Sequence, residues 1–237
     1  MSVQSVVQQR GRRSLNEETE LRVTPTVRIM AAAGVVGPIL FTVAFVMQGL
    51  FRSGEYSAVA EAVSALEAGP NGWVQQINFV VFGVLMIAFA IALHLGMRPS
   101  RGGEIGPAII VLTGVGLVLA GAAFPLREDA AGLTYDPGGH AINGMMTFLS
   151  AGIGLIVVSR RMTRDPRWRS LAAYALASGI TVLALFVAMR VLVMPPDAPL
   201  HAWGGLAQRL VLAVWFPCTI VLACRLLRFT KAPSALG

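Results

Sequence analysis

The sequence has few charged residues for its length. Only 13% of its 237 residues are Asp, Glu, Lys or Arg, whereas 55% are hydrophobic. Soluble domains carry about 25% charged residues, which cover the surface around an apolar core. This chain lacks the charge to cover such a surface. The shortage argues against a soluble helical bundle and favours a protein whose surface is solvated by lipid.

Cysteine and histidine are also scarce, with two and three copies. Cys218 and Cys224 lie in the last apolar stretch without metal-ligand spacing, so we interpret them as free structural thiols. His94, His140 and His201 lie in three separate parts of the chain and form no metal-ligating set. Phosphate-binding glycine loops and nucleophile elbows are missing too. We therefore expect neither a metal nor a cofactor.

The net charge of +7 is distributed in a way that argues against nucleic acid as a partner. Fifteen of the 19 basic residues fall in the two terminal segments and in the connectors near 98–101 and 160–169. These clusters flank apolar stretches, and arginine-rich flanks of membrane spans lie on the cytoplasmic side. We therefore predict that both termini are cytoplasmic and that the protein lies in the cell inner (plasma) membrane.

Six apolar stretches have the length of about 20 residues that a membrane helix needs. They are 29–51, 73–96, 105–125, 140–159, 171–194 and 203–227. Each is too long for a strand and lacks the alternation of a barrel strand. The sequence thus predicts an all-α fold: a polytopic bundle of six transmembrane helices over 28–228. Residues 1–27 are expected to be a disordered cytoplasmic tail without a signal peptide, and residues 229–237 a second cytoplasmic tail.

The first outer loop has the pattern of a short amphipathic helix over 57–68. Ser57 can cap its start, and Gly69-Pro70 can end it. Val59, Val63 and Leu66 fall on one face of such a helix. We expect this helix to lie across the outer mouth of the bundle.

Polar residues within membrane spans are rare and mark functional sites or structural pairs. Here they gather toward the outer ends of the spans, at Gln75, Asn78, His140, Asn143, Arg190 and Arg209. Arg209 needs an acidic partner, for which Glu61 and Glu67 of the outer loop are the first candidates, followed by Asp129 and Asp197. Such a pair is either a structural pin or part of an outward-facing polar pocket. His140 is likewise either a hydrogen-bonded structural residue or a proton carrier.

Three segments resemble the domain-of-unknown-function family 998, a group of small six-helix membrane proteins. They are Val63-Ser64-Ala65-Leu66-Glu67 followed by Asn78 and Gly83, then Phe124-Pro125 followed by acids and His140, and finally Gln208-Arg209. The resemblance extends over about residues 30–228, although Glu67 stands where the family usually has glycine. It implies that Ser64, Asn78, His140 and Arg209 match recurrent family positions. It implies no particular reaction.

A polar cluster beside apolar helices favours binding, and chemical conversion, of a membrane lipid or another lipophilic small molecule. Small membrane terpene cyclases offer an analogy, in which the enzyme is a lyase or isomerase that starts isoprenoid cyclisation with a carboxylic acid. The catalytic candidates are Glu61, Glu67 and His140. The substrate-binding candidates are Ser64, Gln75, Asn78, Phe82, Phe124, Asn143, Arg190 and Arg209. An accessory subunit of a membrane complex and a small-solute transporter are the alternatives, and the transporter lacks a visible inverted repeat.

Overall fold

The computed structural model describes residues 25–97, 102–195 and 197–229. Six long helices dominate this part of the chain, and each is long and apolar enough to cross a membrane. They are α2 (Pro25–Phe51), α3 (Gly72–Gly96), α4 (Ile105–Ala122), α5 (His140–Met162), α6 (Arg169–Leu192) and α7 (Gly204–Phe229). The prediction of six spans is confirmed. The expected tails lie outside the described residues, except that 25–27 and 229 belong to α2 and α7.

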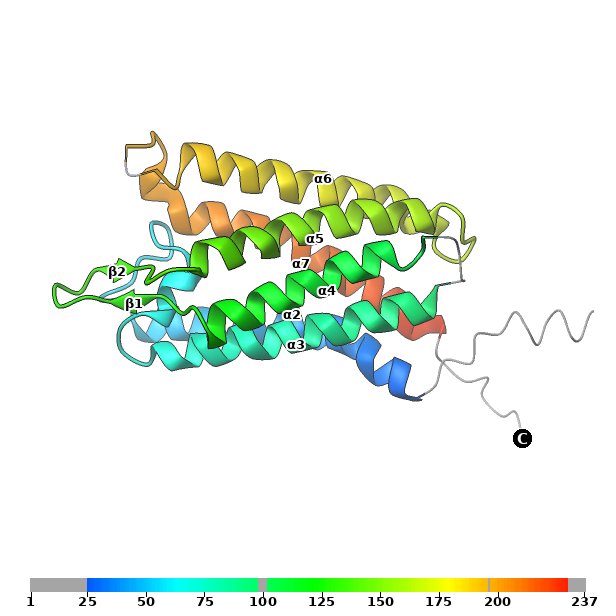
Figure 1. The fold of residues 1–237 in the computed structure, drawn as a ribbon, viewed down its shortest axis with the longest axis horizontal. Coiled ribbons are helices and arrows are strands. Elements are labelled where there is room, and N and C mark those ends of the chain that lie inside the picture. The colour runs from blue at the N-terminus through cyan, green and yellow to red at the C-terminus, as the bar shows by residue number, and fades with distance from the viewer. Residues whose placement is uncertain (1–24, 98–101, 196, 230–237) are drawn as a thin grey trace, which may run out of the picture.

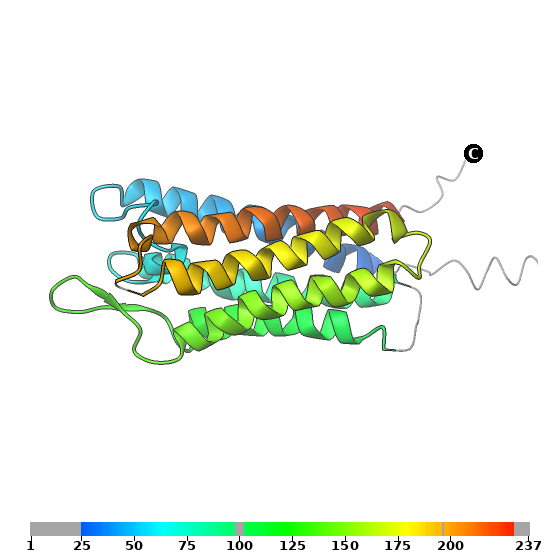
Figure 2. The same ribbon diagram turned by 90° about the horizontal axis from the view of Figure 1, so that it is seen from above.

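The six helices form a closed ring in the order of the sequence. Each helix packs antiparallel against the helices before and after it, and α7 closes the ring by packing on α2 (Figures 1 and 2). The start of α2 and the end of α7 lie at one end of the bundle (Figure 1), which we call the terminal end. The opposite end, which we call the loop end, carries the connections 52–71, 123–139 and 193–203. The basic-residue pattern predicts that the loop end faces outward.

Glycine pairs allow neighbouring helices to approach closely. A Cβ atom added to Gly83 of α3 would lie 2.5 Å from the carbonyl oxygen of Gly114 in α4, and the reverse distance is also 2.5 Å. Gly152 of α5 and Gly179 of α6 face each other in the same way, at 3.0 and 2.7 Å. Backbones that meet at small residues gain van der Waals contact, which is the main source of helix association in lipid.

The outer surface of the ring is apolar and its centre is aromatic. Large side chains such as Val43 and Leu112 are 54% and 47% exposed, which suits contact with acyl chains. Inside the ring, Phe41 of α2, Phe82 of α3 and Trp215 of α7 are at most 2% exposed. Their rings pack in tilted and edge-to-face contacts with centroids 4.8 to 5.8 Å apart, together with Phe216. The core is therefore an aromatic column along the axis of the bundle.

The loop end differs in part from the prediction. Only Val63–Glu67 of the expected helix over 57–68 is helical, and it forms a short 3₁₀ helix, η1. The Ser57 hydroxyl accepts a hydrogen bond from the Ala60 amide, so it shapes a turn at 57–60. A short hairpin, β1 (Arg127–Glu128) and β2 (Thr134–Tyr135), projects beyond the bundle (Figure 2). A second 3₁₀ helix, η2 (His201–Trp203), leads into α7.

Candidate functional site

The segment 56–69 folds over the loop end of the ring and closes it. Val63 and Leu66 of η1 are 1% and 0% exposed, so the apolar side of the segment is buried in the bundle. The Gln208 side chain of α7 accepts a hydrogen bond from the Val63 amide at 2.6 Å. Gln48 of α2 donates to the carbonyl oxygen of Leu66, and Gln76 of α3 donates to that of Glu67. Three helices thus hold η1 in place.

Arg209 also fixes this segment, but through partners that differ from the prediction. Its Nη1 donates to the carbonyl oxygens of Glu61 and Gly205 at 3.2 and 3.0 Å, and its Nη2 donates to the Tyr56 hydroxyl at 2.8 Å. The expectation of an acidic partner is wrong for the described residues, because the Glu61 carboxylate accepts from the Ser57 amide instead. A guanidinium has five donors, and the carbonyls freed by an irregular loop satisfy them well. Arg209 thus ties α7 to the segment 56–69.

Glu67 and His140 form a buried pair at the loop end of the bundle. The Glu67 side chain is 0% exposed, and its Oε2 lies 3.1 Å from His140 Nδ1 and accepts from the Leu126 amide at 3.2 Å. Burial raises the pKa of Glu67 to about 8, even though the hydrogen bond from Leu126 acts in the opposite direction. The Oε1 atom of Glu67 has no hydrogen-bond partner among the described residues. Glu67 is therefore a largely protonated, neutral acid at pH 7.

The hydrogen bonds of His140 define which ring nitrogen carries a proton. Nδ1 lies 3.0 Å from the carbonyl oxygen of Phe124, which can only accept, so Nδ1 is protonated. In the neutral ring Nε2 is then a free acceptor, and in the described residues it has no hydrogen-bond partner. The geometry leaves Nε2 available to a molecule in the bundle.

Asp136 positions His140 by capping the start of α5. Its carboxylate accepts from the amides of Gly138, His140 and Ala141 at 2.8 to 3.2 Å. Partial burial opposes ionisation, but these amides together lower the pKa of Asp136 below its usual value. The charge at the helix N-terminus stabilises α5 and orients the ring of its first residue.

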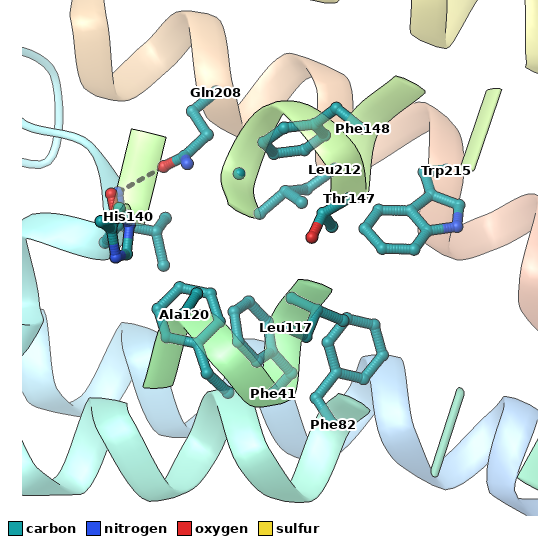
Figure 3. Close-up of a pocket in the computed structure, with 14 residues that line it drawn as sticks. Phe41, Phe82, Leu117, Ala120, His140, Thr147, Phe148, Gln208, Leu212 and Trp215 are labelled. Carbon is teal, nitrogen blue, oxygen red and sulfur yellow. Dashed lines mark hydrogen bonds between the residues drawn. The ribbon is translucent and has the colours of Figure 1, made fainter. Parts of the chain in front are cut away.

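A small cavity lies directly beneath η1, inside the ring of helices (Figure 3). Its volume is about 40 Å³, enough for a few water molecules, whereas pockets for drug-sized ligands measure about 300–1,000 Å³. Five of its 14 lining residues are aromatic: Phe41, Phe79, Phe82, Phe148 and Trp215. Its polar lining comes from Ser64, His140, Thr147 and Gln208. Gly144 also lines the cavity, and the space beside it is empty, because a Cβ atom there would meet nothing within 4 Å.

The predicted site residues separate into three groups. Ser64, Phe82 and His140 line the cavity. Glu67, Gln75, Asn78 and Asn143 are buried nearby without lining it. Asn78 ties α3 to α2 by donating to the Phe41 carbonyl, while Asn143 binds the Gly139 carbonyl of its own helix. Glu61, Phe124, Arg190 and Arg209 also lie outside the lining, and Phe124 and Arg190 are exposed.

Sequence reasoning missed about half of the cavity wall. The lining residues that it did not single out are Phe41, Leu117, Ala120, Gly144, Thr147, Phe148 and Leu212. Phe and Trp occur throughout the apolar spans, so hydropathy alone does not separate ring-facing from lipid-facing aromatics. Gln208 gave a usable signal, since a glutamine two turns inside a span needs a partner. Across the residues that the structure describes, no cluster of three or more His, Cys, Asp or Glu side chains is placed to hold a metal.

A comparison with known protein families matches residues 35–225 to the family described as "Protein of unknown function (DUF998)". This chain belongs to DUF998. The DUF998 match reaches from α2 to α7 and includes η1, His140 and the whole cavity wall. Neither curated proteins nor solved structures gave a match to the chain. The family description of DUF998 proteins assigns no activity, so functional inference rests on the geometry of the site.

Proposed function

We propose that this DUF998 protein binds a lipophilic small molecule that carries a hydrogen-bonding head group. The observation that supports this proposal is the pairing of Glu67 with His140 at the edge of a cavity walled by aromatic rings. An apolar body suits the rings, and a hydroxyl or carbonyl head suits the free Nε2 of His140 and the Ser64 hydroxyl. Ligand sites of this kind combine a mostly apolar wall with a few placed polar groups.

Conversion of the ligand is the finer form of this proposal. Glu67 does not line the cavity, so a proton for the ligand would come from a doubly protonated His140. Nε2 would take up a proton from solvent and give it to the ligand, while Nδ1 keeps its own proton and an ionised Glu67 pairs with the imidazolium. The pKa of Glu67, at about 8, keeps both of its protonation states accessible near neutral pH. Aromatic faces would stabilise the carbocation of an acid-initiated isoprenoid cyclisation. Glu61 has no comparable support, because its carboxylate binds the Ser57 amide away from the cavity.

The present cavity is far smaller than an isoprenoid, so binding requires η1 to move outward. Hydrogen bonds from Gln48, Gln76 and Gln208 hold η1, and each can be exchanged for a bond to water at the loop end. Displacing η1 would join the cavity to the outer membrane interface. A lipophilic molecule could then enter head-last, with its polar end next to His140.

A photoreactive farnesol analogue, with a diazirine in its tail, tests binding to the purified protein in detergent. We expect cross-linked peptides from α3, α5 and α7 that unlabelled farnesol protects. Gly144→Leu, whose Cβ atom would meet nothing within 4 Å, should place its side chain in the cavity and abolish protected labelling. Ala141→Leu, exposed on the same helix and outside the cavity lining, is the matched control and should label normally. Equal labelling of both variants would contradict binding in this cavity.

Product analysis tests conversion separately from binding. Membranes that contain the protein are incubated with farnesol and its terminal epoxide, and cyclic products are sought by gas chromatography and mass spectrometry. We expect His140→Ala to abolish turnover while protected labelling by the probe is retained in part. Full turnover in both His140→Ala and Glu67→Gln would rule out the acid chemistry proposed here.

The projecting hairpin supports a role as an accessory subunit as the second candidate. Leu133 and Tyr135 of the hairpin are 65% and 45% exposed, and the hairpin projects beyond the end of the bundle (Figure 2). Exposed apolar side chains on a protruding hairpin suit contact with another protein. Replacing Leu133 and Tyr135 with serine would remove cross-links to a partner if this role is correct, and would leave farnesol labelling unchanged.

A further inference from the structure

A second hollow lies at the loop end, on the outside of the ring between the end of α2 and the start of α3. These two helix ends lie side by side (Figure 1), and the groove between them has a volume of about 780 Å³. Its wall is formed by Gln48, Phe51, Arg52, Glu55, Asn71 and Trp73, among others. None of these residues lines the central cavity, so this is a separate site.

Gln48 presents a buried acceptor in this groove. The residue is 7% exposed, and its Nε2 donates to the carbonyl oxygens of Leu66 and Asn71 at 3.0 and 3.1 Å. Both of these partners can only accept, which fixes the orientation of the amide group. Its Oε1 is buried and has no hydrogen-bond partner in the described part of the chain. Such an atom needs a donor that the protein itself does not provide.

Arg52 presents free donors beside it. Its Nη1 is occupied by the carbonyl oxygens of Ala68 and Leu66, at 2.7 and 3.5 Å. Nη2, by contrast, has no hydrogen-bond partner among the described residues. Nε also lacks a hydrogen bond there, but it is buried and forms a long ion pair with Glu55 Oε2 at 4.0 Å. Two parallel N–H groups on one edge of a guanidinium match the two oxygens of a phosphate. A phosphate on the Nε and Nη2 edge of Arg52 would replace the exposed Glu55 carboxylate beside Nε.

Two carboxylates near Arg52 restrict the kind of phosphate that fits. Glu55 Oε2 lies 4.0 Å from Arg52 Nε on a side chain that is 65% exposed. Glu128 Oε2 and Arg52 Nη2 lie together beside Gly69. A purely anionic head group would be repelled by these acids, whereas one with an added ammonium group would pair with them. An ammonium with N–H bonds would also supply the donor that Gln48 Oε1 lacks.

We infer that this groove binds the head group of phosphatidylethanolamine from the surrounding leaflet. The phosphate lies on the Nε and Nη2 edge of Arg52, and the primary ammonium lies between Glu55 and Gln48. The apolar part of the wall suits the rest of the lipid, since Met47, Phe51 and Trp73 are 45%, 82% and 60% exposed. Tryptophan at this level is typical of the membrane interface, where lipid head groups lie.

Native mass spectrometry of the delipidated protein in detergent tests this inference. Phosphatidylethanolamine, phosphatidylcholine and phosphatidylglycerol with identical acyl chains are added in equal amounts. We expect phosphatidylethanolamine adducts to exceed phosphatidylcholine adducts by about tenfold, because the trimethylated ammonium has no N–H to donate. Equal retention of the three lipids, or a preference for phosphatidylglycerol, would overturn the inference.

Two variants separate the roles of the groove residues. Arg52→Lys keeps the charge and the reach to the Ala68 carbonyl but loses the phosphate-binding edge, so lipid retention should fall about tenfold. Glu55→Gln should weaken the preference for phosphatidylethanolamine over phosphatidylcholine. Arg190→Lys, an exposed arginine at the same end but outside the groove, is the matched control and should behave as the wild type. A wild-type lipid pattern in both groove variants, with the control folded, would refute the site.

Discussion

Glu67→Gln is the perturbation whose effect follows most directly from the structure. Burial raises the pKa of Glu67 from 4.5 to about 8, so the folded protein keeps a proton that the unfolded chain releases between these values. Below pH 4.5 both states hold the proton, so Glu67 does not change the free energy of unfolding. As the pH rises from 4.5 to 8 the free energy of unfolding falls, and above pH 8 it stays at its lowest value. The slope is about 1.4 kcal/mol per pH unit, which gives an upper limit of roughly 5 kcal/mol.

Glutamine removes this pH dependence while keeping the contacts. Its carbonyl oxygen can accept from His140 Nδ1 and the Leu126 amide, as Oε2 does, and its amide nitrogen replaces the unpartnered Oε1. We expect wild type and Glu67→Gln to be about equally stable at pH 5. At pH 8 the variant should be the more stable protein, by roughly 2–4 kcal/mol after allowance for residual solvation.

Thermal unfolding in detergent between pH 5 and 8.5 measures this difference. For a chain of this size each kcal/mol shifts Tm by about 2–4 °C, so the two curves should separate by roughly 10 °C at the alkaline end. Asp197→Asn, which changes an exposed acid at the same end of the bundle, should follow the wild type. Parallel curves for wild type and Glu67→Gln would refute a buried neutral acid at this position.

Three further predictions concern packing, anchoring and orientation. Gly114→Ala places a methyl group 2.5 Å from a backbone carbonyl and should lower stability by about 1–3 kcal/mol, whereas Gly144→Ala should be neutral in the same unfolding assay. Arg209→Met removes the hydrogen bonds from the guanidinium to the Tyr56 hydroxyl and to the Glu61 and Gly205 carbonyls, and should cost about 2–3 kcal/mol, seen as a lower Tm and faster proteolysis of the loop. In intact cells an impermeant maleimide should label Ser57→Cys, while Thr163→Cys should react only after permeabilisation, and the reverse pattern would contradict the proposed orientation.

The transmembrane architecture was predictable because lipid imposes a simple constraint on length and hydropathy. All six spans appeared in the sequence, and errors were confined to their ends. The third span was expected to reach Pro125 but ends at Ala122, and the fourth continues past 159 to Met162. Arginine at the end of a span can remain helical while its head reaches the interface, so charge marks a membrane boundary without marking a helix end.

The candidate site was predictable only in its general position. The sequence placed the candidate polar residues toward one end of the spans, because polar groups at depth are costly. Of these residues, Ser64 and His140 line the cavity at the loop end. Which groups meet depends on the path of an irregular loop, and hydropathy carries no information about that path. Thus Glu67 pairs with His140, whereas Arg209, for which Glu67 was a candidate, binds backbone carbonyls and Tyr56. The inward or outward direction of Phe124 and Arg190 could not be read from spacing for the same reason.

The closure of the ring by its final helix has a consequence for biogenesis. Trp215 and Gln208 belong to α7, which also seals the bundle against α2. During synthesis each of the first five spans can pack against the span before it. Without α7, however, the ring stays open between α2 and α6, and lipid can enter through this gap. The cavity is closed off from lipid only when α7 leaves the translocon and packs against α2. A chain truncated before residue 204 should therefore insert into the membrane but lack the cavity.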